Sequence, residues 1–92
     1  MQWEFEQRLA DAKATVLGVL SGRITPEARR ADFDEDVVYF SVRAAEIHDP
    51  AWLLQVIAES AQTGTDPATI SLVLDCMGPL RPQAEGLIHR AE

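Results

Sequence analysis

Proline and glycine divide this 92-residue chain into short helical segments, and their positions constrain the fold more than any other feature. Three prolines directly follow a threonine or an aspartate, at Thr25-Pro26, Asp49-Pro50 and Asp66-Pro67. The side-chain oxygen of either residue caps a free amide at a helix start, and proline at the next position has no amide to leave unpaired. A glycine ends three of the apolar runs, as expected where a helix closes with a left-handed residue: Gly22, Gly64 and Gly78.

Apolar residues at spacings of three and four predict a first helix over residues 2–21. Its inner face is predicted to consist of Phe5, Leu9, Ala12, Val16 and Leu20. Two further helices start at Pro50 and Pro67 and form an antiparallel hairpin, each predicted to span about 13 residues. A short helix follows from Pro82, and residues 26–31 form at most a single turn.

Residues 34–48 are predicted to form a helix, although Val37–Val42 also has the composition of a strand. Acidic residues before this segment and alanines after it favour the helix. Its inner stripe is predicted to consist of Val37, Phe40, Ala44 and Ile47. The apolar residues between them widen the face, so a monomer must bury this helix on two sides. If it does not, two copies are expected to pair across the helix as a symmetric dimer.

These segments predict an all-α fold, a compact bundle of four to five helices with short antiparallel connections. At 92 residues the chain has no room for a second core, so residues 1–92 are predicted to form a single domain. Apolar residues make up 47% of the chain and charged residues 25%. This balance is typical of soluble globular proteins and unlike that of disordered chains.

Charge and composition exclude several classes of partner and compartment. The formal net charge of −7 argues against a nucleic-acid backbone or an anionic membrane as the partner. No apolar run reaches the ~18 residues of a membrane span, and Met1–Glu6 lacks the basic and apolar regions of a secretory signal. A single cysteine cannot form a disulfide bond within the chain, which predicts a reducing, cytoplasmic location. Seven arginines against one lysine favour a GC-rich bacterial source.

No pattern in the sequence carries catalytic or metal-binding chemistry. Acids alternate before the second helix as at the start of a calcium loop, but the glycine and the final glutamate of that loop are replaced by Val37 and Arg43. Neither histidine has a second ligand at the spacing of a zinc site. Cys76 is predicted to be a buried structural residue. We therefore predict no cofactor, no metal ion and no enzymatic activity.

Two groups of residues are candidates for binding a partner. The first is an acidic run at the start of the second helix, formed by Asp32, Asp34, Glu35 and Asp36. Asp34 suffices as the helix cap and one or two more acids complement the helix dipole, so the surplus charge is predicted to face a basic partner. The second group is the aromatic pair Tyr39 and Trp52, which either pack in the core or anchor a partner. Phe5 and Phe40 are predicted to be core residues.

The predicted function is that of a small acidic helical module for protein–protein interaction. In size and charge the chain resembles bacterial immunity proteins and antitoxins, a resemblance that implies an inhibitor or accessory protein acting on a basic partner. The alternative is a structural homodimer without catalytic activity, held together by the wide apolar face of the second helix. Salt dependence distinguishes the two, because charge-steered binding weakens in salt and apolar self-association does not.

Overall fold

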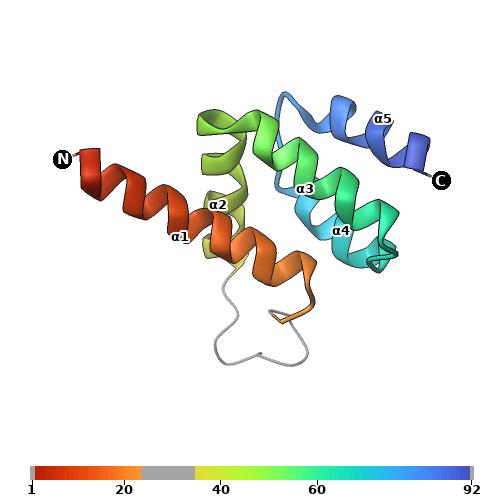
Figure 1. Ribbon diagram of the computed structural model, residues 1–92, viewed down its shortest axis with the longest axis horizontal. Coiled ribbons are helices and arrows are strands. Elements are labelled where there is room, and N and C mark those ends of the chain that lie inside the picture. Colours follow the sequence, from red (N-terminus) through yellow and green to blue (C-terminus); the bar gives the residue numbers. More distant parts are fainter. Residues whose placement is uncertain (1, 24–34, 92) are drawn as a thin grey trace.

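A computed structural model describes residues 2–23 and 35–91, and within these ranges the chain forms five helices and no strand (Figure 1). The helices are α1 (Gln2–Leu20), α2 (Glu35–His48), α3 (Pro50–Gln62), α4 (Pro67–Asp75) and α5 (Arg81–Ala91). The predicted all-α bundle of four to five helices is confirmed, and Val37–Val42 lies within α2. The predicted turn at residues 26–31 and the predicted cap Asp34 lie outside the described residues.

The predicted aspartate caps start two of the helices. The Asp49 carboxylate accepts a hydrogen bond from the Trp52 amide in the first turn of α3. The Asp66 carboxylate accepts one from the Ala68 amide of α4 at 2.9 Å. In both helices a proline occupies the first turn, where its missing amide leaves no donor unpaired. These two boundaries are therefore fixed by neighbouring residues alone.

Glycine ends two segments as predicted, but not the third. Gly22 and Gly64 have φ angles of 79° and 85°, in the left-handed region that only glycine enters at no steric cost. Gly78 has no positive φ, so its predicted role as a left-handed helix end is wrong. The preceding helix already ends at Asp75, with Cys76 as its C-cap, and α4 is only nine residues long.

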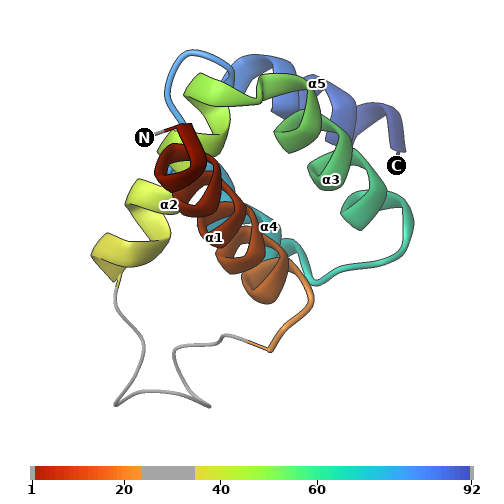
Figure 2. The same ribbon diagram turned by 60° about the vertical axis from the view of Figure 1, so that its left-hand side comes forward.

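All five helices contribute to one apolar core. α1 lies across α2 and also contacts α4, while α3 packs against α4 and α5 (Figures 1 and 2). The buried residues of this core are Val16, Val19, Leu20, Val38, Val42, Ala45, Leu53, Ile57, Ile70, Val73, Leu74, Met77 and Ala84. The described residues thus share a single core, to which even the short α4 and the connection after it contribute.

The helix α2 is turned the other way from the prediction. Val38, Val42 and Ala45 face the core and are 3%, 0% and 0% exposed. Part of the predicted inner stripe lies on the surface instead, where Phe40 is 66% exposed and Ile47 is 60% exposed. The prediction was wrong because α2 is apolar on two sides. Helical periodicity gives the spacing of each apolar face but does not say which one points inward.

Phe5 also lies on the surface, at 47% exposed, and is not the core residue that was predicted. The N-terminal part of α1 extends past the other helices in Figure 1, so its first turns have little to pack against. The Phe5 ring contacts the His48 ring edge-on, with ring centroids 4.8 Å apart. Core contacts from α1 come from its second half instead, through Val16, Val19 and Leu20.

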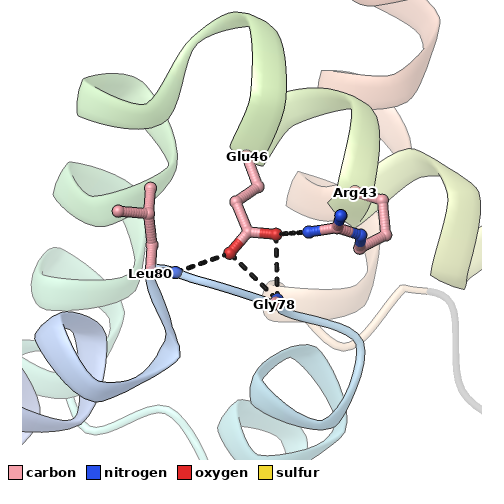
Figure 3. A network of polar contacts seen from close by, with 4 residues as sticks. All are labelled: Arg43, Glu46, Gly78 and Leu80. Atoms are coloured by element: carbon pink, nitrogen blue, oxygen red, sulfur yellow. Dashed lines mark hydrogen bonds and ion pairs between the residues drawn. The ribbon is translucent and has the colours of Figure 1, made fainter.

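A buried carboxylate fixes the orientation of α2 (Figure 3). Glu46 is 4% exposed, and both of its carboxylate oxygens accept the Gly78 amide at 2.9 Å. Oε2 also accepts the Leu80 amide at 2.9 Å, and Oε1 accepts an N–H group of the Arg43 guanidinium. Each carboxylate oxygen is therefore bonded, which is what a buried charge requires. The bonds join the end of α2 to the connection between α4 and α5.

Glu46 lies beside the core-facing residues of α2, since Val42 is four residues, about one helical turn, before it. Rotating α2 so that the predicted stripe faced the core would withdraw the carboxylate from its donors. Two backbone amides and a guanidinium would then lose a charged acceptor. A hydrogen bond to a charged group contributes about 1.5–3 kcal/mol to stability, so the network is strong enough to decide between two faces of similar apolar character.

We predict that Glu46→Gln destabilises the fold by about 2–3 kcal/mol. Both carboxylate oxygens accept hydrogen bonds, so either orientation of the glutamine amide directs its NH₂ group at another donor. The free energy of unfolding in urea measures the loss. Glu59→Gln is the matched control, because Glu59 is exposed on α3 and its exposed carboxylate bonds to Gln55. Equal stability of the two variants would contradict the structural role of Glu46.

At Gly78 the chain closely approaches the side chain of Arg43. A Cβ atom at this position would lie 2.5 Å from Nη1 of Arg43 and 3.1 Å from its Cζ. An alanine here therefore forces the guanidinium away from Glu46, while the backbone amide keeps its bonds to the carboxylate. We predict that Gly78→Ala costs about 1 kcal/mol more in the natural sequence than in an Arg43→Ala background. A double-mutant cycle in urea measures this coupling, and additive effects would contradict it.

Candidate functional site

The surface most distinct from the rest of the molecule is an exposed row of apolar side chains on α2. We call this row, formed by Val37, Phe40, Ala44 and Ile47, the α2 stripe. Val37 is 50% exposed, Ala44 is half-buried, and the other two are exposed by more than half. The residues are three, four and three positions apart, so they line one side of the helix. The side that faces the core is apolar as well, which makes α2 apolar on two sides.

A shallow groove of about 380 Å³ runs beside the α2 stripe, between α1 and α2. Its α2 wall includes three of the stripe residues, and its α1 wall includes Ala12 and Thr15. Two charged side chains also line it, Arg8 and Asp11, one of each sign. In the view of Figure 2, α2 lies at the left edge of the molecule, and none of the other four helices of the described residues lies outside it. We call this feature the α1–α2 groove.

Aromatic side chains extend the apolar surface beyond the stripe. Tyr39 is 44% exposed, and its ring contacts the Phe40 ring edge-on at a centroid separation of 5.4 Å. At the other end of α2, His48 contacts Phe5 of α1 in the same manner. Aromatic side chains are enriched among the residues that carry most of the energy of protein interfaces. The exposed side of α2 therefore has the composition of a binding surface.

The structure places the acidic candidates only in part. Asp32 and Asp34 lie outside the described residues, and Glu35 begins α2 but its side chain is not described. Asp36 is exposed in the first turn of α2, directly before the first residue of the α2 stripe. Tyr39 follows it by three positions and is exposed as well. Two of the predicted partner-binding residues therefore lie together beside the stripe.

Trp52 lies apart from these residues, in the first turn of α3. It is half-buried and packs against the core. The Lys13 ammonium lies 5.2 Å from the centroid of the indole ring and 2.6 Å from Oδ2 of Asp49. Lys13 thus contacts both the cap of α3 and the tryptophan that follows it. Trp52 has the surroundings of a packing residue that holds α1 against α3.

The pKa of the Asp49 carboxyl is held below its usual range, mainly by the hydrogen bond from Lys13 and also by the bond from the Trp52 amide. Partial desolvation acts in the opposite direction. A carboxyl with a lowered pKa in the folded state stabilises the fold above its unfolded pKa of about 4. That contribution is lost as the pH falls through the lower, folded-state pKa.

We predict that Lys13→Met raises the pKa of Asp49 toward its ordinary value and lowers the stability of the protein at neutral pH. The stability difference between natural protein and variant should shrink as the pH falls from about 4 through the lowered pKa of Asp49 in the natural protein, because below that pKa the carboxyl is protonated in both. NMR titration of the Asp49 carboxyl carbon and urea unfolding at several pH values measure the two effects. An unchanged titration in the variant would contradict the assigned cause. Asp49→Ser is the companion variant, since serine keeps a capping oxygen without the charge.

A second pocket, of about 420 Å³, lies where the α3–α4 hairpin meets α5. Ile70, Leu74 and Ile88 supply much of its apolar lining, and Thr65 and Ser71 contribute polar side chains. No charged side chain of the described residues lines it. Ligand pockets use a few convergent polar groups to orient what they bind. The hydroxyl groups of Thr65, just before α4, and Ser71, within α4, do not by themselves specify a ligand. The α2 surface is therefore the stronger candidate for a binding site.

No protein-family model matches this chain, and neither a curated protein nor a solved structure is similar to it. In the described ranges, no helix is both long and apolar enough to cross a bilayer. The same residues contain no group of three histidine, cysteine, aspartate or glutamate side chains placed to hold a metal ion. The candidate site is therefore defined by the geometry of α2 and its groove.

Sequence reasoning missed the α2 stripe as a surface because it placed the same residues inside. The signal that could have found it was the excess of apolar residues over residues 37–47, more than one face of a helix can bury. Helical periodicity alone predicts from that excess a wide core face, with dimerisation as the alternative. A single helix with two separate apolar sides explains it better: Val38, Val42 and Ala45 are inside and the stripe is outside.

Proposed function

We propose that this protein is a protein–protein interaction module whose binding site is the α2 stripe. The observation that carries the proposal is that α2 is apolar on two sides, one buried in the core and one exposed. A helix that only closes the core of a monomer needs a single apolar face. Contiguous exposed apolar residues of this kind mark interaction sites in soluble proteins.

The exposed side chains are of the type and size that anchor a partner. Phe40 is the most exposed of the large apolar residues in the described part of the chain, and it lies in the middle of α2 between Val37 and Ile47. Burying a phenylalanine or isoleucine side chain that was exposed is worth about 1.5–3 kcal/mol. The polar side chains of the α1–α2 groove, Arg8 and Asp11, would form the rim that surrounds such an anchor.

Of the two predicted functions, the stripe supports apolar binding more directly than charge-steered inhibition. The inhibitor interpretation depends on the acidic run, of which only Asp36 has a described side chain. Negative charge at the start of α2 would still speed the approach of a basic partner. In the proposal the α2 stripe supplies the affinity, and the acids contribute to the rate of association.

The proposed role is binding and not catalysis, and the proposed compartment is the cytoplasm. The α2 surface presents apolar and aromatic groups. Among the described residues that line its groove, one is acidic and one is cationic, and the hydroxyl groups are those of Thr15 and Ser41. The single cysteine, Cys76, is half-buried at the end of α4 and forms no disulfide. A fold that is held by its core and by hydrogen bonds suits a reducing compartment.

We predict that truncating a side chain of the α2 stripe leaves the stability of the fold nearly unchanged, whereas truncating one on the core face of α2 lowers it. In dilute solution Phe40→Ser should change the free energy of unfolding by no more than about 0.5 kcal/mol, because the ring is already exposed. Val42→Ala should cost about 2 kcal/mol, because it opens a cavity in a fully buried site. The free energy of unfolding in urea, measured for both variants, tests this prediction. A loss for Phe40→Ser as large as that for Val42→Ala would place Phe40 in the core and remove the binding site.

Site-specific photocrosslinking in cells of the source organism tests the proposed function. A photoreactive phenylalanine analogue at position 40 should give a discrete crosslinked product, which Ile47→Asp in the same chain should abolish. The control is the same analogue at position 17, because Leu17 is 42% exposed on α1 and does not line the α1–α2 groove. Equal, diffuse labelling from positions 40 and 17 would refute the α2 stripe as a binding site.

A further inference from the structure

We infer that the partner of the α2 stripe is the α2 stripe of a second copy of this chain, packed antiparallel about a two-fold axis. This inference rests on the proposed function and specifies its partner. It follows from the spacing and sizes of the four stripe residues, from the charges beside them and from the amount of apolar surface they expose.

The spacing of the stripe is symmetric about position 42. Val37 and Ile47 lie five residues before and after that position, and Phe40 and Ala44 lie two residues before and after it. In a two-fold symmetric interface, residue i of one copy meets residue j of the other, and j meets i. An antiparallel pair of α2 helices centred there therefore places Val37 opposite the partner's Ile47.

The sizes of the side chains are complementary in the same register. Phe40 lies opposite the partner's Ala44, so the largest side chain of each stripe meets the smallest one of the other. Close helix packing at 8–10 Å between axes needs large side chains to fill the space above small ones. A parallel pairing would set Phe40 against the partner's Phe40 and Ala44 against the partner's Ala44, which leaves a clash beside a void. The antiparallel register removes both.

The charged side chains that line the α1–α2 groove also suit a second copy. The α1–α2 groove is lined by one base and one acid, Arg8 and Asp11, so a second copy brings the same balanced pair to the interface. The net charge of −7 acts against self-association at long range. At physiological ionic strength charges are screened over about 8 Å, so this repulsion weakens as salt is added. Self-association should therefore strengthen with salt, whereas binding of a basic partner would weaken.

The exposed area predicts a dimer of modest affinity. The stripe and Tyr39 expose on the order of 400 Å² of side chain per copy, taking about 150–250 Å² for an aromatic residue. A standard interface buries about 800 Å² per partner, so the stripe supplies its apolar centre and the α1 wall of the groove must supply the remainder. Interfaces at the lower end of this range form weak complexes. We expect a dissociation constant in the micromolar range.

Sedimentation equilibrium of the full chain across the micromolar range tests the inference. The natural protein should shift from monomer to dimer, and the dimer should be favoured at high salt. Phe40→Asp should weaken the association at least tenfold, while the control Leu17→Asp should leave it unchanged. Both positions are exposed, so both variants should keep the helical circular dichroism of the natural protein.

A mixing experiment tests the antiparallel register. Val37→Asp and Ile47→Lys should each abolish self-association, because each places a charge against an apolar residue of an identical copy. An equimolar mixture of the two variants should associate again, because the introduced aspartate faces the introduced lysine and the other contact remains Val37 against Ile47. Absence of association in the mixture, when the natural protein dimerises, would overturn the register.

A chain that stays monomeric throughout the micromolar range would overturn the inference as a whole. If position 40 then crosslinks to a different protein, the proposed function stands and only the identity of its partner changes. A dimer that Phe40→Asp does not weaken, or that dissociates in high salt, would also overturn the inference, because the contact would then lie elsewhere or depend on charge. The crosslinking and sedimentation results thus separate failure of the inference from failure of the proposed function.

Discussion

The architecture depends on one buried charge. A carboxylate removed from water destabilises a fold unless hydrogen bonds compensate both of its oxygens, and Glu46 obtains them from the amides of Gly78 and Leu80 and from the Arg43 guanidinium. The amide donors belong to the connection between α4 and α5, and the acceptor belongs to α2. The network therefore sets the rotation of α2 and, at the same time, the path by which the chain enters α5.

The rotation of α2 determines what the molecule presents to its surroundings. Its core face carries compact side chains, Val38, Val42 and Ala45, which allow α1 to cross closely. The bulkier Phe40 and Ile47 are left on the outside, where they contribute little to the stability of a monomer. Burying this exposed apolar surface against a partner would release free energy, because it removes apolar groups from water. A single hydrogen-bonded network thus connects the stability of the fold to the composition of the proposed interface.

Much of the fold could be predicted from the sequence, because helix ends depend on local chemistry. Asp49 and Asp66 cap amides only two or three residues away. The direction of α2 could not be predicted, since the deciding acceptor, Glu46, has amide donors 32 and 34 residues further along the chain. A glutamate in the last turns of a helix, with alanines before it, has the sequence pattern of a solvent-exposed residue. For the same reason the candidate site could be predicted only in part. Of the two aromatic candidates, Tyr39 lies beside the α2 stripe and Trp52 packs against the core. The predicted spacing of the stripe residues is correct, but they face solvent and not the core.

The α2 helix has one apolar side in the core and another in solvent. Paramagnetic relaxation enhancement of methyl groups by a soluble gadolinium chelate measures this directly, in solution dilute enough to keep the chain monomeric. We expect strong enhancement at the methyl groups of Val37 and Ile47, which are exposed, and little at those of Val38 and Val42, which are buried. The reverse pattern, with Val37 and Ile47 protected and Val38 and Val42 relaxed by the probe, would contradict it.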